Sequence, residues 1–132
     1  MNEFSPHMTE QEVNRISMLG LAHIGDGVYE LLVRTRLCTQ GHSVAGELHR
    51  LTVAHVKAPA QAAAMEKLLP ILTEEELALY KRGLNAHVHG VPQGAKVGEY
   101  HAATGLEALF GWLYLLGRRE RLYELFALLW ED

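Results

Sequence analysis

Apolar residues recur three and four positions apart along most of the chain, a spacing that gathers them on one face of an α-helix. The clearest run begins after Ser17, which we expect to cap the helix, and stops at Gly41. A second clear start is Thr73, because Glu76 three residues later completes a capping box. The predicted helices run over residues 17–39, 44–56, 59–69, 73–84, 97–117 and 118–132.

Between these helices there is no sustained alternation of apolar and polar residues, the pattern typical of a half-buried strand. Residues 85–95 contain two glycines and a proline and are predicted to form the longest irregular loop. Residues 1–16 are predicted to be a partly frayed segment, with one short helical turn after a capping box at Thr9. The expected fold is all-α, a single domain over residues 17–132 with about six helices.

The composition agrees with one globular domain, because 48% of the 132 residues are hydrophobic and 21% are charged. Cys38 is the single cysteine, which excludes an internal disulfide and a Cys-rich zinc site. The first residues lack the pattern of a secretory signal, and the longest apolar stretch, 108–117, is far shorter than the roughly 20 residues that cross a bilayer. We therefore expect a cytoplasmic protein without a membrane span.

The charge balance argues against a protein that coats nucleic acid by bulk charge. Twelve Lys and Arg stand against sixteen Asp and Glu, which gives a net charge of −4 with eight histidines counted as neutral. Residues 48–101 nevertheless concentrate basic side chains and histidines. A local basic patch therefore stays a possibility.

Asp26 lies in the middle of the first long helix, between Gly25 and Gly27 and inside an apolar run. Aspartate is a poor residue for a helix interior, and each glycine there costs about 1 kcal/mol relative to alanine. Glycines permit close approach, so a second helix, a metal or a substrate could come near this carboxylate. The alternative is a plain polar stripe facing solvent, because Glu30 and Arg34 follow one and two turns later.

Glu107 has almost only apolar residues and glycines around it in its helix. Such a helix is usually buried, and a buried carboxylate must bind a cation or shift its pKa to stay neutral. Because neither Asp26 nor Glu107 has a Lys or Arg one turn away, we expect the two to share a cation. Ligation by oxygen alone favours Mg²⁺ or Mn²⁺ over zinc. The alternative is that both are merely paired internally.

Cationic side chains end the fourth predicted helix, where Asn85 follows Lys81 and Arg82. The helix dipole alone favours cations in a last turn. The functional interpretation is a phosphate-binding site, in which Arg82 presents its planar guanidinium and Asn85 an amide. Three more residues could extend this site or simply form a solvated helix face: His49, Arg50 and Lys57.

Four stretches of sequence together resemble mini-ribonuclease III, the short branch of the ribonuclease III superfamily. They are LAHIGDGVYELLVR (Leu21–Arg34), LHRLTVAHVKAPAQA (Leu48–Ala62), YKRGLNA (Tyr80–Ala86) and HGVPQGAKVGEYHAATGLEALFGWLYLLGRRERL (His89–Leu122). One such stretch alone would be a weak signal. Four in the right order, covering the chain from about Ser17 to its end, make the resemblance specific.

The resemblance implies an all-helical endonuclease domain that acts as a homodimer and cuts double-stranded RNA with Mg²⁺, or with Mn²⁺ as a substitute. Asp26 and Glu107 match acidic positions of the family and would be catalytic residues and metal ligands. The implied task is maturation of precursor 23S ribosomal RNA, leaving 5′-phosphate ends, with a ribosomal protein as a candidate helper. The candidate RNA-binding residues are His49, Arg50, Lys57, Gln61, Lys81, Arg82 and Asn85.

The sequence departs from the family pattern at several positions. Ala22 and Thr104 stand where full-length ribonuclease III has two further acidic ligands, so water, backbone or RNA phosphate would complete the metal site. Leu84 replaces an arginine, and Pro59 and Gln93 replace lysines, which predicts a weaker hold on RNA. Two other interpretations stay open: a non-catalytic RNA-binding module with the same fold, and a helical adaptor domain that binds neither RNA nor metal.

A two-fold dimer is also expected on physical grounds. The fifth predicted helix is almost entirely apolar, and Trp112 and Trp130 add large apolar side chains. Six short helices do not easily cover that much apolar surface, so we expect a second copy of the chain to cover the remainder.

Overall fold

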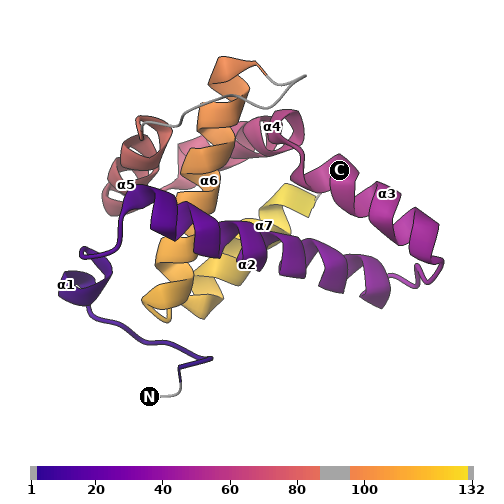
Figure 1. Cartoon of the computed structure of the whole chain (residues 1–132), viewed down its shortest axis with the longest axis horizontal. Coiled ribbons are helices and arrows are strands. Elements are labelled where there is room, and N and C mark those ends of the chain that lie inside the picture. The colour runs from indigo at the N-terminus through magenta and orange to yellow at the C-terminus, as the bar shows by residue number, and fades with distance from the viewer. Residues whose placement is uncertain (1–2, 87–95, 131–132) are drawn as a thin grey trace.

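The computed structural model describes residues 3–86 and 96–130. Within these ranges the fold is all-α, which confirms the predicted class (Figure 1). The elements in chain order are α1 (Glu10–Val13), α2 (Met18–Thr39), α3 (Ala45–Val56), α4 (Ala58–Leu68), the 3₁₀ turn η1 (Leu69–Ile71), α5 (Glu74–Leu84), α6 (Val97–Leu115) and α7 (Arg119–Trp130).

The described helix ends agree with the predicted ones to within two residues, because most of them are set by local capping. The Ser17 hydroxyl accepts a hydrogen bond from the Gly20 N–H at 2.9 Å, and Thr73 forms the predicted capping box with Glu76. The estimate of about six helices leaves out α1, which is the short helical turn predicted after Thr9, and its capping box with Glu12 is present. Lys57 both ends α3 and caps α4, so these helices follow each other without a loop.

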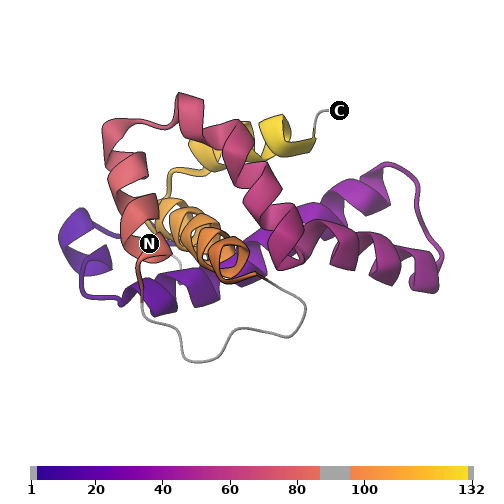
Figure 2. The same cartoon turned by 90° about the horizontal axis from the view of Figure 1, so that it is seen from above.

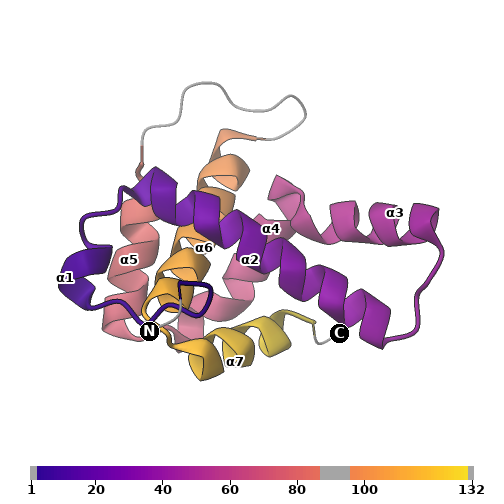
Figure 3. The ribbon, with the colours of Figure 1, turned by 60° about the horizontal axis from the view of Figure 1, so that its bottom comes forward.

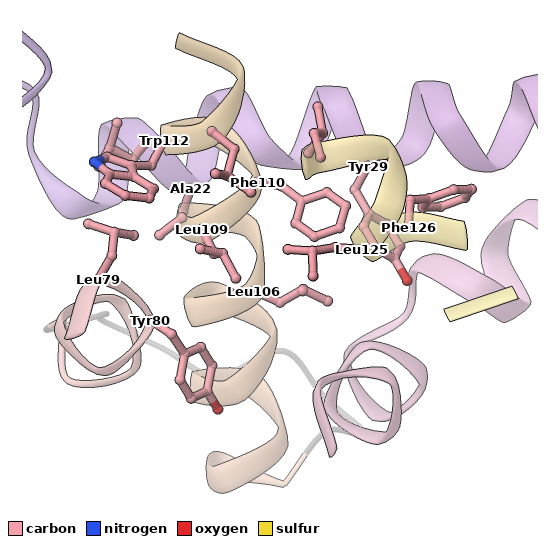
Figure 4. Close-up of a cluster of buried hydrophobic side chains, with 14 of the residues drawn as sticks. Ala22, Tyr29, Leu79, Tyr80, Leu106, Leu109, Phe110, Trp112, Leu125 and Phe126 are labelled. Carbon is pink, nitrogen blue, oxygen red and sulfur yellow. The ribbon is translucent and has the colours of Figure 1, made fainter. Parts of the chain in front are cut away.

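The hydrophobic core is built around α6, whose residues from Ala103 to Trp112 are buried apart from Glu107. Figure 2 looks steeply down this helix and shows α2, α4 and α5 around it, while α7 lies across its lower part in Figure 1. Figure 4 shows Tyr29 of α2 meeting Phe110 of α6 and Phe126 of α7, with ring centroids 5.4 and 5.8 Å from Tyr29. Because α6 is buried on nearly every side, a polar residue within it must find a specific partner.

A helical hairpin extends from one side of this core. The second half of α2 runs out beyond α6, the chain reverses at Gly41, where φ is +100°, and α3 returns beside it (Figure 3). Three large apolar side chains of the hairpin are exposed, at 63%, 66% and 43% of their surface: Leu31, Val44 and Val53. The hairpin therefore carries apolar surface that the rest of the chain leaves uncovered.

The N-terminal segment, which the sequence predicts to be partly frayed, is held against α6 in its described part. Val13 of α1 is fully buried. The Met8 N–H donates to the Leu115 carbonyl at 2.8 Å, and the Tyr114 hydroxyl donates to the Phe4 carbonyl at 3.0 Å. One apolar anchor and two hydrogen bonds thus order residues whose own sequence has no helical period.

Candidate functional site

Two glycines bring α2 and α6 into backbone contact. A Cβ added at Gly25 would lie 1.6 Å from the carbonyl oxygen of Glu107, and one added at Gly111 would lie 2.0 Å from the carbonyl oxygen of Leu21. The helices can therefore cross this closely only where both positions lack side chains. A Cβ at Gly27 would have no neighbour within 4 Å, so of the two glycines beside Asp26 only Gly25 permits the close approach.

This crossing places Asp26 beside Glu107. Asp26 is exposed on α2, whereas Glu107 is half-buried on α6. Burial is the largest cause that raises the pKa of Glu107, and the negative charge of Asp26 and a hydrogen bond with it raise this pKa further, so that together they bring it to about 8. Glu30 and Arg34, one and two turns after Asp26, form an ion pair at 2.8 Å. Asp26 is exposed, as in the alternative of a polar stripe, but it also forms a hydrogen bond with Glu107.

Two buried side chains lie on the inner side of Glu107. Tyr29, one turn after Asp26, has its pKa raised to about 12 by burial and then by the charge of Glu107. Gln61 of α4 is only 1% exposed, and its Nε2 donates to Oε2 of Glu107 at 3.5 Å. The structure thus places Gln61 behind the carboxylate pair, away from the exposed surface where an RNA-binding residue was expected.

A second buried carboxylate, Glu76, shows what an ordinary structural acid looks like in this fold. Its two oxygens accept hydrogen bonds from Arg121 of α7 at 2.8 and 2.9 Å, and it also caps α5. Burial raises the pKa of Glu76, but the hydrogen bonds of Arg121 and Thr73 outweigh that effect and lower it. Within the described residues Glu107 has no such cation, so its site lacks a positive charge that the fold supplies elsewhere.

The pair fits a hard divalent cation. Both groups offer carboxylate oxygens, and a cation between them would offset the burial and the repulsion from Asp26 that together keep Glu107 protonated. Across residues 3–86 and 96–130 no group of three or more His, Cys, Asp or Glu could hold a metal. One turn before each acid stands an uncharged residue, Ala22 or Thr104, and both are buried. Mg²⁺ commonly binds through one or two carboxylates and keeps waters or phosphates as its other ligands, so two protein ligands suffice.

The other predicted RNA-binding residues are exposed but divide between two regions. His49 lines a hollow of about 260 Å³ between α2 and α3, and Arg82 lines one of about 220 Å³ beside α1 and α5. Asn85 caps α5, and its backbone N–H donates to the Lys81 carbonyl at 3.0 Å. The exposed residues of the set are His49, Arg50, Lys57, Lys81, Arg82 and Asn85. Residues 87–95, which include Gln93 and most of the predicted loop, lie outside the described part.

The sequence did not indicate that Tyr29 and Gln61 adjoin Glu107. A weak signal exists for Gln61, because it is the one polar residue in the run APAQAAAM, where small apolar residues otherwise predominate. For Tyr29 the signal is its place three residues after Asp26 on the same helix. Neither pattern identifies the partner, which comes from another helix.

No helix in the described part of the chain has the length and apolar character needed to span a membrane.

A model of the ribonuclease III domain matches residues 19–118. Several curated bacterial proteins named Mini-ribonuclease 3 are similar over most of their length. The one from Symbiobacterium thermophilum is 49% identical over 80% of this chain and 82% of its own. Those from Thermoanaerobacter sp. and Enterococcus faecalis are 42% and 41% identical, over 92% and 87% of this chain and 85% and 89% of theirs.

A solved structure is similar as well. The crystal structure of a protein from Fusobacterium nucleatum superimposes with a TM-score of 0.78 at 32% identity, covering 84% of this chain and 88% of that one. The likeness in fold therefore accompanies the likeness in sequence.

Proposed function

The chain belongs to the ribonuclease III family of endoribonucleases, in its mini-ribonuclease 3 branch, and from this premise we propose that it cleaves double-stranded RNA with a divalent metal bound by Asp26 and Glu107. The observation that carries the proposal is the carboxylate pair itself. Its two acids come from different helices, meet at a crossing that two glycines permit, and lack a protein cation among the described residues. A fold maintained for stability alone has no use for such a pair.

In this proposal Asp26 and Glu107 hold Mg²⁺, with Mn²⁺ as a substitute. The bound ion would lower the pKa of a water and neutralise charge on the phosphodiester. The products of this hydrolysis would carry 5′-phosphate and 3′-hydroxyl ends. Glu107 must release its proton when the ion binds, because only the carboxylate form is a ligand. Asp26, on the exposed side of the pair, leaves the site open to an approaching phosphate.

The RNA would be held by the exposed basic residues on α3 and at the end of α5. With a net charge of −4 the protein cannot rely on bulk attraction, so these local contacts must provide the affinity. A-form RNA is recognised mainly through shape, phosphates and 2′-hydroxyls, so sequence preference should be modest. We propose precursor 23S ribosomal RNA as the substrate, met in the cytoplasm, and a ribosomal protein as the helper that selects the site.

The active form is proposed to be a homodimer. Of the two tryptophans expected to contribute, Trp112 is buried at 4% exposure, whereas Trp130 is half-buried and stacks on His55 at 4.3 Å. The α2–α3 hairpin offers other apolar surface through Leu31, Val44 and Val53. We place the two-fold contact there, since exposed apolar residues on one projection are typical of an interface.

The test is cleavage of an end-labelled RNA duplex by the purified protein in Mg²⁺, beside an EDTA control and the Asp26→Asn and Glu107→Gln variants. Discrete fragments are expected from the wild type only, with unchanged helical circular dichroism in both variants. Intact RNA that is shifted on a native gel would favour the non-catalytic RNA-binding module. RNA that is neither cut nor bound, with a melting temperature indifferent to divalent metal, would favour the adaptor.

A further inference from the structure

Gln61 is a buried amide on a helix face that otherwise packs apolar residues. Met65, one turn later, and Leu68 are buried on α4 in the same way, at 1% and 0% exposure. An amide buried without a hydrogen bond destabilises a fold, whereas a leucine here would pack without that penalty. The amide nitrogen of Gln61 donates a hydrogen bond to Glu107.

The contact links α4 to α6 across a sequence separation of 46 residues. As a structural cross-link it is poor, because the distance from Nε2 to Oε2 is 3.5 Å, at the long end for a hydrogen bond. The Gln61 side chain is also poorly placed to contact RNA, because at 1% exposure a duplex cannot reach it. What the contact does is orient one oxygen of Glu107 from a buried residue of α4, whereas the exposed Asp26 approaches the same carboxylate from α2.

We propose that Gln61 is a positioning residue for the metal site, holding the Glu107 carboxylate in the orientation in which it binds a divalent cation together with Asp26. The inference rests on the proposed function. Metal ligands are commonly oriented by a hydrogen-bonding partner behind them. That support matters more here than in a site with four acids, because the described residues bring only two carboxylates together and a misplaced one removes half of them.

The experiment uses Mn²⁺ alone, without RNA, and follows the rise in melting temperature as Mn²⁺ is titrated into the full chain. Gln61→Met keeps the volume and removes the amide, and Gln61→Asn keeps the amide but withdraws it by one methylene. Met65→Leu is the matched control, a conservative change at an equally buried position one turn along the same helix. RNA binding in EDTA is measured for all of these proteins by native gel.

Both Gln61 variants should need about tenfold more Mn²⁺ than the wild type for half of the rise, as is typical when the partner of a metal ligand is removed. Met65→Leu should match the wild type, and RNA binding in EDTA should be unchanged throughout. Retention of the wild-type Mn²⁺ response in Gln61→Met would overturn this inference and leave the proposed function standing. Loss of RNA binding with an intact Mn²⁺ response would overturn it in favour of an RNA contact. A wild type that does not respond to Mn²⁺ would overturn the metal-dependent function and the inference with it.

Discussion

At the scale of single residues, the site depends on the different surroundings of two similar acids. Asp26 is exposed, whereas Glu107 is half-buried with its pKa raised to about 8 by burial and by Asp26. Glu107 therefore carries a proton at neutral pH when no metal is bound, and in the proposed site a metal would compete with that proton for the carboxylate. Glu76, whose pKa is lowered by Arg121 and Thr73 despite its burial, shows that burial alone does not produce this state.

The raised pKa of Glu107 predicts a pH-dependent stability. In the unfolded chain this carboxyl ionises near its ordinary value of 4.5, but in the folded protein it keeps its proton to about pH 8. The folded state binds the extra proton between these values, so this contribution is fully present below about pH 4.5 and is lost as pH rises through 8. In EDTA the free energy of unfolding should fall from pH 5 to pH 9 by about 4 kcal/mol more in the wild type than in Glu107→Gln.

Urea unfolding followed by circular dichroism at both pH values measures this difference. The contributions of the eight histidines to the pH dependence cancel in the comparison, because both proteins contain them. Saturating Mn²⁺ should reduce the loss at high pH, since the cation then takes the place of the proton. Parallel pH profiles for the two proteins in EDTA would show that Glu107 is not the group with the raised pKa.

At the scale of helices, the crossing of α2 over α6 determines whether the pair exists at all. Gly25→Ala should destabilise the fold by about 3 kcal/mol or more, because its Cβ would meet the backbone of Glu107 and the helices would have to separate. Gly27→Ala is the control two residues away, with nothing within 4 Å of its Cβ. It should stabilise the protein by up to about 1 kcal/mol through helix propensity. Equal effects in urea unfolding would contradict the role assigned to the crossing.

Helix positions could be predicted because their signals are local. Ser17 and Thr73 cap the helices that follow them, and apolar spacing defines the rest. Asp26 and Glu107 could be singled out because each is an unlikely residue for its place, which is a property of sequence neighbours. The role of Gln61 could not be predicted, since its partner is 46 residues away and only packing of α4 on α6 brings them together. The expectation that Trp112 is exposed was wrong for the same reason, because the residues that bury it come from other elements.

At the scale of the whole molecule, an acidic protein that binds RNA must do so through few cations. If Lys81 and Arg82 contact phosphates, replacing either with alanine should weaken duplex binding and reduce the slope of log affinity against log salt by roughly 0.7–0.9. Arg15→Ala, an exposed arginine outside the predicted set, is the control and should leave the slope unchanged. Native gel titrations in EDTA at several salt concentrations measure the slope. An undiminished slope in both variants would assign the phosphate contacts to other residues.

The proposed homodimer also belongs to this scale, because it follows from exposed apolar surface on the single chain. The exposed apolar residues of the α2–α3 hairpin lie on a projection that the core does not cover, so a second copy is the simplest way to remove them from water. Light scattering at micromolar concentration should give twice the mass of the chain for the wild type. Leu31→Glu and Val53→Asp should each shift the mass toward the monomer, because a charge would be buried in the contact. Ile71→Glu, an exposed apolar position in η1, should remain dimeric. A dimer that tolerates both hairpin substitutions would place the interface on another face, and a monomeric wild type would remove the dimer from the proposal altogether.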